Sequence, residues 1–125
     1  MEEMINATPL RIIIVPTLEE YDNFIEEFVQ ENYESILPRY CKSKNSTVIS
    51  LKDRTIISII PFCKYAFKGR RFHQLFITQK AYDKYINTIP EVFFPYLVNF
   101  PYDIDEEYRI QIIEYERYKW IKLKE

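Results

Sequence analysis

The residues most suited to chemistry lie in one stretch, "CKYAFKGRRFHQLFI" at positions 63–77, which holds the only glycine and the only histidine of the chain. The cations of this stretch are Lys64, Lys68, Arg70 and Arg71. Lysine and arginine bind phosphate and carboxylate groups, and Gly69 allows a positive φ or a close approach of the backbone. We therefore predict a basic loop that displays cations to an anionic ligand, with a plain turn glycine as the alternative.

Aromatic side chains alternate with these cations, because Phe67 precedes the glycine and Phe72 follows it. This pattern is compatible with stacking on bases combined with contacts to phosphates. The candidate binding site also includes Lys52 and Arg54, which lie upstream in the same basic part of the chain. Phe72 fits a hydrophobic core as well as it fits a ligand contact, so both interpretations stay open.

The single histidine excludes metal sites built on a histidine pair, and the two cysteines, Cys41 and Cys63, are not arranged as C-x-x-C. We therefore predict neither a metal nor a cofactor, and reduced thiols in a cytoplasmic protein. Cys63 and His73 could form a nucleophilic pair, but a histidine at the entry of a strand is more often structural.

A run of carboxylates, "YDIDEEY" at positions 102–108, offers a second place for chemistry. Its acidic residues are Asp103, Asp105, Glu106 and Glu107. They could bind the metal ion of a nuclease, but a solvated turn or helix start is the preferred interpretation. The nucleophile motif G-x-S-x-G needs two glycines and is excluded. The sequence therefore predicts that the chain is not an enzyme.

Charge is strongly segregated along the chain, although the net charge is only -2. Residues 1–37 carry nine acidic and one basic side chains, 38–80 ten basic and one acidic, and 81–125 nine acidic and six basic. Either an acidic helix covers a basic sheet and neutralises it, or a basic face binds a polyanion or an acidic protein. The near-neutral total favours the first interpretation.

The elements that position these residues begin with "LRIIIV" (10–15), a continuous apolar run that predicts a buried strand. Pro16 ends the strand, and Thr17 with Glu20 forms a capping box for a long acidic helix that ends before Pro38. The apolar stripe of this helix comprises Leu18, Tyr21, Phe24, Ile25, Phe28, Val29, Ile36 and Leu37. A polar basic loop is expected over 39–46.

The middle of the chain predicts a hairpin, because β-branched runs at 47–51 and 55–62 are separated by three residues. A strand over 73–77 and a shorter second helix over 79–88, capped by Thr78, follow. Prolines shorten or break any helix over 89–101, and 108–123 is ambiguous, with strand favoured. We predict one α/β domain over 1–125 with a mixed sheet of about four to five strands.

Three segments together resemble a part of the ATPase core of phage terminase large subunits and related helicase-like ATPases. They are "RIIIVPTLEEYDNFIEEF" (strand, Pro-Thr turn, helix), "VISLKDRTIISIIP" (hairpin) and "KGRRFHQLFI" (basic glycine loop leading into the Walker B strand). The resemblance covers about two-thirds of the chain and implies that Gly69 turns the chain tightly before that strand while basic side chains project outward.

The chain departs from that family where nucleotides are bound and hydrolysed. No G-x-x-x-x-G-K-[ST] motif is present, and Thr78 and Gln79 stand where the Walker B acidic pair is expected. Neither side chain can hold magnesium as a carboxylate does. The resemblance therefore implies an ATPase scaffold that does not hydrolyse ATP.

Composition and the lack of an assembled catalytic set favour a binding function, since 47% hydrophobic and 17% aromatic residues predict a packed globule. The leading hypothesis is a non-catalytic interaction protein, of phage or mobile-element origin, that binds and modulates or inhibits a host protein in the host cytoplasm. The alternative is a module that binds DNA or RNA through the basic 39–71 segment. No membrane contact is predicted, since no apolar run is long enough to span one.

Overall fold

A computed structural model gives the arrangement of these elements, and it describes residues 9–37, 41–43, 46–62, 71–85, 87–98, 102, 104 and 109–113. The strands are β1 (Arg11–Val15), β2 (Cys41–Lys42), β3 (Thr47–Ser50), β4 (Ile56–Ile59), β5 (Gln74–Thr78) and β6 (Ile110–Ile113). The helices are α2 (Tyr21–Glu31), α3 (Gln79–Tyr85) and α4 (Ile89–Phe93), with 3-10 turns η1 (Tyr33–Ser35) and η2 (Phe94–Tyr96).

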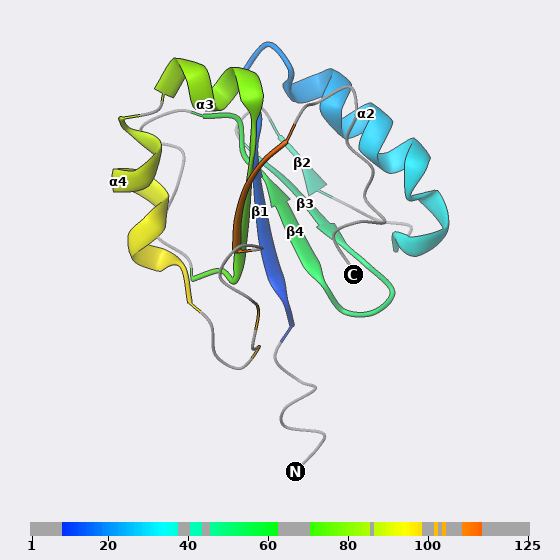
Figure 1. Ribbon diagram of the computed structural model, residues 1–125. Coiled ribbons are helices and arrows are strands. Elements are labelled where there is room, and N and C mark those ends of the chain that lie inside the picture. The colour runs from blue at the N-terminus through cyan, green and yellow to red at the C-terminus, as the bar shows by residue number, and fades with distance from the viewer. Residues whose placement is uncertain are drawn as a thin grey trace.

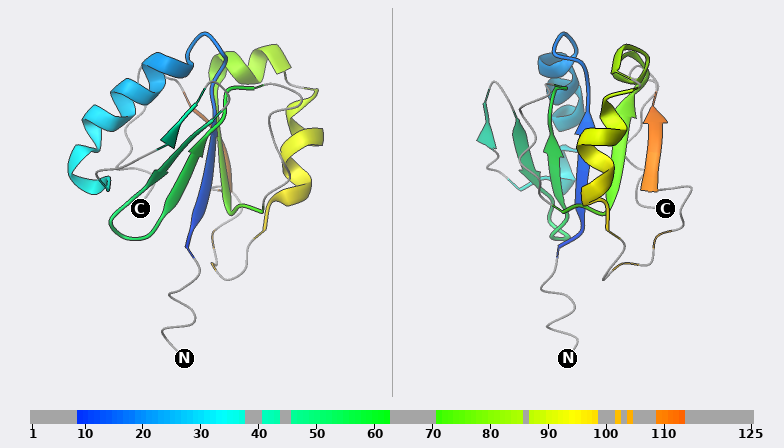
Figure 2. Two further views of the ribbon diagram at one scale, coloured as in Figure 1. Left: turned by 180° about the vertical axis from the view of Figure 1, so that it is seen from behind. Right: turned by 90° about the vertical axis from the view of Figure 1, so that its left-hand side faces the viewer.

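The strands form one mixed sheet in the order β2-β3-β4-β1-β5-β6. β4, β1, β5 and β6 run parallel to one another, whereas β3 is antiparallel to β4 and β2 to β3. Helix α2 covers one face of this sheet and α3 with α4 cover the other, as the side view of Figure 2 shows. The predicted α/β class with a mixed sheet is confirmed, with six strands among the described residues.

Alternation along the strands divides the apolar side chains between the two faces. Ile12 and Ile14 pack with the apolar stripe of α2 in one cluster, which we call the α2-side core. Ile13 and Val15 pack with α3 and α4 in the other, the α3-side core. β1, which lies inside the sheet, therefore contributes side chains to both cores and packs against the helices on both faces (Figure 1).

The N-terminal helix is shorter than predicted. Regular α-helix ends at Glu31, and the backbone N–H and side-chain amide of Asn32 both donate to the carbonyl of Phe28. These bonds satisfy a carbonyl at the helix end. After the helix, Ile36 is buried and forms an isolated bridge with Leu51. Before the helix, Leu18, which was predicted on the buried stripe, is 69% exposed.

The remaining segments follow the sequence closely. The hairpin of β3 and β4 is confirmed, and so is the short helix after β5, whose first turn is capped by Thr78 accepting from the N–H of Ala81. The segment 110–113 is the strand β6, which is the alternative that the sequence favours. The predicted loop over 39–46 contains the two-residue strand β2, because Cys41 and Lys42 pair with the start of β3. None of the described helices is long and apolar enough to cross a membrane.

Candidate functional site

Some of the residues predicted to form the basic binding site lie outside the described residues, namely Lys64, Phe67, Lys68, Gly69 and Arg70. Of the others, Arg71 is exposed directly before the entry to β5, and Lys52 and Arg54 are exposed in the turn between β3 and β4. Phe72 is only 1% exposed and packs in the α3-side core. The proposed contact role for Phe72 is therefore wrong, because its ring faces Phe93 in an edge-on arrangement rather than solvent.

These exposed cations belong to a larger arrangement at the end of the sheet where the parallel strands begin, here called the amino edge. Every arginine among the described residues lies there: Arg54 before β4, Arg11 at the start of β1, Arg71 before β5 and Arg109 before β6. The register places Arg11 opposite Ile56 of β4. Neighbouring strands are about 4.8 Å apart, so the row extends over about 14 Å.

Hydrogen bonds fix the middle of this row. The backbone N–H of Arg11 donates to Nδ1 of His73 over 3.0 Å, and the N–H of His73 donates to the Arg11 carbonyl over 2.9 Å. His73 is 4% exposed, and the ring of Tyr102 meets it edge-on. The histidine is thus structural, as predicted, and Cys63, its suggested catalytic partner, lies outside the described residues.

Arg109 lies next to this pair of strands and is half-buried. Its Nε atom is buried and has no hydrogen-bond partner among the described residues. A buried donor of a charged group is costly when it stays unsatisfied, so this guanidinium favours a nearby anion.

Arg54 occupies an unusual backbone position, with a φ of 78°. It ends a three-residue turn in which its N–H donates to the Leu51 carbonyl and the N–H of Thr55 donates to Asp53. Glycine is the residue that normally occupies the left-handed position of such a hairpin. Arg54 therefore carries a long side chain at a position whose backbone conformation favours glycine.

Replacing Arg54 with glycine is expected to raise the free energy of unfolding by about 1 kcal/mol, because the left-handed strain is relieved. The Lys52→Gly variant in the same turn is the matched control and should lower stability by about 0.5–1 kcal/mol, since that position gains nothing from glycine. Urea unfolding of both variants measures the difference. Destabilisation by Arg54→Gly would contradict the assignment of strain to this residue.

A second polar cluster lies at the opposite end of the sheet, where the parallel strands end. Oε1 of Glu20 accepts hydrogen bonds from the N–H and hydroxyl of Thr17, over 3.0 and 3.1 Å, and from the hydroxyl of Thr78, over 2.7 Å. The N–H of Glu20 donates back to the Thr17 hydroxyl, which completes the predicted capping box. All three residues are buried.

This second cluster joins the ends of two neighbouring strands. Thr17 follows β1 and Thr78 closes β5, and from there the chain passes to helices on opposite faces of the sheet. Ligands of open α/β sheets commonly bind at such a switch point. In this chain the bonds between Thr17 and Glu20 close the turn that leads into α2, which itself begins at Tyr21, and Thr78 caps α3. These polar groups therefore serve the fold.

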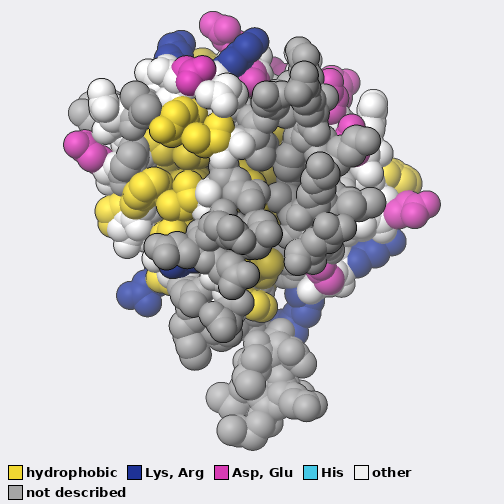
Figure 3. Space-filling model, viewed as in Figure 1, with side chains coloured by type: hydrophobic (Ala, Val, Ile, Leu, Met, Phe, Trp, Pro, Cys, Tyr) yellow, Lys and Arg dark blue, Asp and Glu magenta, His cyan; other side chains and the backbone are white. Residues whose placement is uncertain are grey.

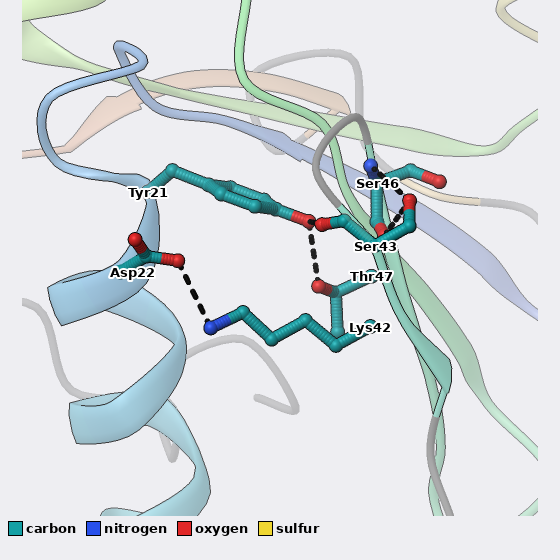
Figure 4. A network of polar contacts seen from close by, with 6 residues as sticks. All are labelled: Tyr21, Asp22, Lys42, Ser43, Ser46 and Thr47. Carbon is teal, nitrogen blue, oxygen red and sulfur yellow. Dashed lines mark hydrogen bonds and ion pairs between the residues drawn. The ribbon is translucent and has the colours of Figure 1, made fainter.

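The third polar network joins α2 to the short edge of the sheet (Figure 4). The hydroxyl of Tyr21 donates to the carbonyl of Ser43 over 2.9 Å and shares a 2.7 Å hydrogen bond with the fully buried hydroxyl of Thr47. Asp22 pairs with Lys42 over 2.9 Å, but both side chains are exposed, so this ion pair adds little stability. Burial raises the pKa of Tyr21 above its ordinary value of 10.0, while Thr47 and Lys42 lower that pKa and Asp22 raises it.

The Tyr21→Phe variant is expected to lose about 1.5 kcal/mol of stability near neutral pH, because the Thr47 hydroxyl loses its partner. The raised pKa means that the folded state keeps the phenolic proton more tightly than the unfolded state does. The contribution of Tyr21 is therefore complete below pH 10 and disappears as the pH rises through the raised pKa. Urea unfolding between neutral and strongly alkaline pH should show the two proteins converging, and a constant difference would contradict this.

The acidic residues of α2 face away from the basic residues of the sheet. Tyr21, Phe24, Ile25 and Phe28 are buried against the strands, whereas Glu26, Glu27 and Glu31 are exposed on the outer side. The predicted neutralisation of a basic sheet by this helix is therefore limited, among the described residues, to the peripheral pair of Asp22 and Lys42. Helix α2 contacts the sheet through its apolar stripe.

Two aromatic residues of η2, which directly precedes the bridge from Leu97 to Phe72, lie at the surface. Phe94 and Tyr96 of η2 are 40% and 37% exposed. Figure 3 shows hydrophobic side chains at the surface on the side of α3 and α4. The run of carboxylates at Asp103, Asp105, Glu106 and Glu107, interpreted from the sequence as a solvated turn or helix start, lies outside the described residues. Within the described residues, no group of three or more histidine, cysteine or acidic side chains could hold a metal ion.

Comparisons of the chain with protein-family models, curated proteins and solved structures found no match. The resemblance to the terminase ATPase core therefore stays a prediction.

Proposed function

We propose that this chain is a non-catalytic binding protein whose amino edge binds a polyanion, with nucleic acid as the ligand. The observation that carries the proposal is the row formed by Arg54, Arg11, Arg71 and Arg109 at the starts of four adjacent parallel strands. Guanidinium groups bind phosphates through two parallel hydrogen bonds. Several guanidinium groups along one edge of the sheet suit a polymer that carries many phosphates.

Two further features support this choice. The chain retains an arginine at the strained position 54, where glycine would relieve the backbone, and the Nε donor of Arg109 is buried without a partner among the described residues. Both features cost stability in the folded protein, and such costs are common at binding sites.

A host protein, the partner favoured by the sequence, is the second candidate. Tyr96 is exposed next to Arg71, and Phe94 is exposed in the same 3-10 turn, η2. Protein interfaces are enriched in aromatic residues and arginine. An acidic protein surface would compete for the same arginines. The predicted phage origin and the predicted modulation of a host protein apply to this second candidate function.

Binding of a fluorescent oligonucleotide of about twelve nucleotides, followed by anisotropy between about 50 and 200 mM salt, tests the proposal. We expect affinity to fall steeply with salt. The Arg54→Gly/Arg71→Gln variant should bind at least tenfold more weakly, with a salt slope smaller by about 1.4, because two phosphate contacts are lost.

The matched control is Lys80→Ala/Lys84→Ala, which removes two exposed cations from α3 at the opposite end of the sheet. This variant should bind as the wild type does. Equal losses in both variants would indicate non-specific attraction, and the absence of salt-sensitive binding at micromolar protein would reject nucleic acid as the ligand. Displacement of the oligonucleotide by polyglutamate at matched charge would favour the acidic protein partner.

A further inference from the structure

We infer that the nucleic acid bound at the amino edge is single-stranded and that Tyr96 stacks on one of its bases; this inference rests on the proposed function. Proteins that bind single strands combine a basic track for the backbone with aromatic side chains for the bases. The row of arginines provides the first of these. The second must be an exposed ring within reach of the row.

Tyr96 meets this requirement because backbone hydrogen bonds hold it beside Arg71. The N–H of Phe72 donates to the Tyr96 carbonyl over 3.0 Å, and the N–H of Val98 donates to the Phe72 carbonyl over 2.7 Å. These bonds form a parallel bridge between Phe72 and Leu97. Arg71 directly precedes Phe72, and Tyr96 directly precedes Leu97. Their Cα atoms are therefore neighbours across the bridge, about 5 Å apart.

The local packing keeps this ring in place. Phe72, between Arg71 and the sheet, is buried against Phe93, and Phe93 directly precedes η2. Tyr96 itself is 37% exposed, and its backbone is anchored to the core through the bridge to Phe72. A ring on an anchored segment requires less ordering of the chain when a base stacks on it.

Double-stranded nucleic acid suits this surface less well. The bases of a duplex are stacked on one another, so an exposed ring cannot reach their faces without unstacking them. The longest described helix, α2, exposes Glu26, Glu27 and Glu31, and these carboxylates repel the phosphates that line a groove. Among the described residues, the arginines gather at the edge of a sheet, and the two exposed lysines of α3, Lys80 and Lys84, lie at its other end.

The test compares oligothymidine of about twelve nucleotides with a duplex of the same length, using wild type, Tyr96→Ala and Tyr96→Phe. We expect the single strand to bind at least tenfold more tightly than the duplex. Tyr96→Ala should weaken single-strand binding about tenfold, while Tyr96→Phe, which keeps the ring, should stay within about twofold of wild type.

Photocrosslinking of wild-type protein to an oligonucleotide that carries 5-iodouracil gives a second measurement, which does not depend on how the alanine variant folds. Crosslinks at Tyr96 support the inference, and crosslinks confined to other residues overturn it. Unchanged affinity of Tyr96→Ala, or equal affinity for the duplex, overturns the inference but leaves the proposed function intact. Absence of salt-sensitive binding to either ligand overturns the proposed function itself.

Discussion

Replacement of Glu20 by alanine is expected to lower the free energy of unfolding by about 3 kcal/mol. Its Oε1 atom accepts three hydrogen bonds, and two of the donors are the hydroxyls of Thr17 and Thr78, which are 5% and 0% exposed. Removing the acceptor leaves these buried donors unsatisfied. The loss affects both helices, because Thr78 also accepts from Ala81 at the start of α3.

Two variants make this prediction specific. Glu19→Ala removes the same charge from an exposed neighbour and should change stability by less than about 0.5 kcal/mol. Glu20→Gln keeps an oxygen that can accept and should cost about 1 kcal/mol. Urea unfolding at neutral pH measures all three. Similar effects at positions 19 and 20 would show that the buried cluster does not stabilise the fold.

The second large effect is expected for Phe72→Ala, which should cost about 4 kcal/mol. Phe72 is 1% exposed in the α3-side core, and its ring lies 6.5 Å from that of Phe93, in an edge-on arrangement. Truncation leaves a cavity that the surrounding backbone, bridged to Leu97, can close only in part.

Phe94→Ala is the matched control, since it removes the same side chain from a position that is 40% exposed. The expected cost is about 1 kcal/mol or less. Thermal and urea unfolding of the two variants should therefore differ clearly. A cost below about 1 kcal/mol for Phe72→Ala would return this ring to the surface role that the sequence left open.

Much of the fold could be predicted because its signals are local. The apolar run at 10–15, the capping box of Thr17 and Glu20, and the β-branched runs around 52–54 each specify an element through neighbouring residues. The extent of the first helix could not be predicted, because its apolar spacing continues to Leu37 while Asn32 ends the helix with bonds to the Phe28 carbonyl. The spacing of apolar residues does not reveal such a cap.

Part of the candidate site follows from the sequence. Lys52, Arg54 and Arg71 are exposed, and their binding role stays a prediction, whereas Phe72 could not be distinguished from a surface aromatic by its spacing alone. The row of arginines depends on strand order and direction, which the sequence does not specify directly. A signal for it does exist: an arginine stands just before each of four separate apolar runs, those of β1, β4, β5 and β6. Once the strands are known to be parallel, these four positions fall on one edge.

The two ends of the sheet hold different groups of polar residues, and this separation affects which substitutions the fold can accept. Glu20, Thr17 and Thr78 lie where the parallel strands finish, while the arginines lie where they start, a full strand length away. Substitutions of the arginines at one end need not disturb the bonds that secure the turn into α2 and the start of α3 at the other. The surface at the amino edge can therefore change in sequence while the architecture stays the same.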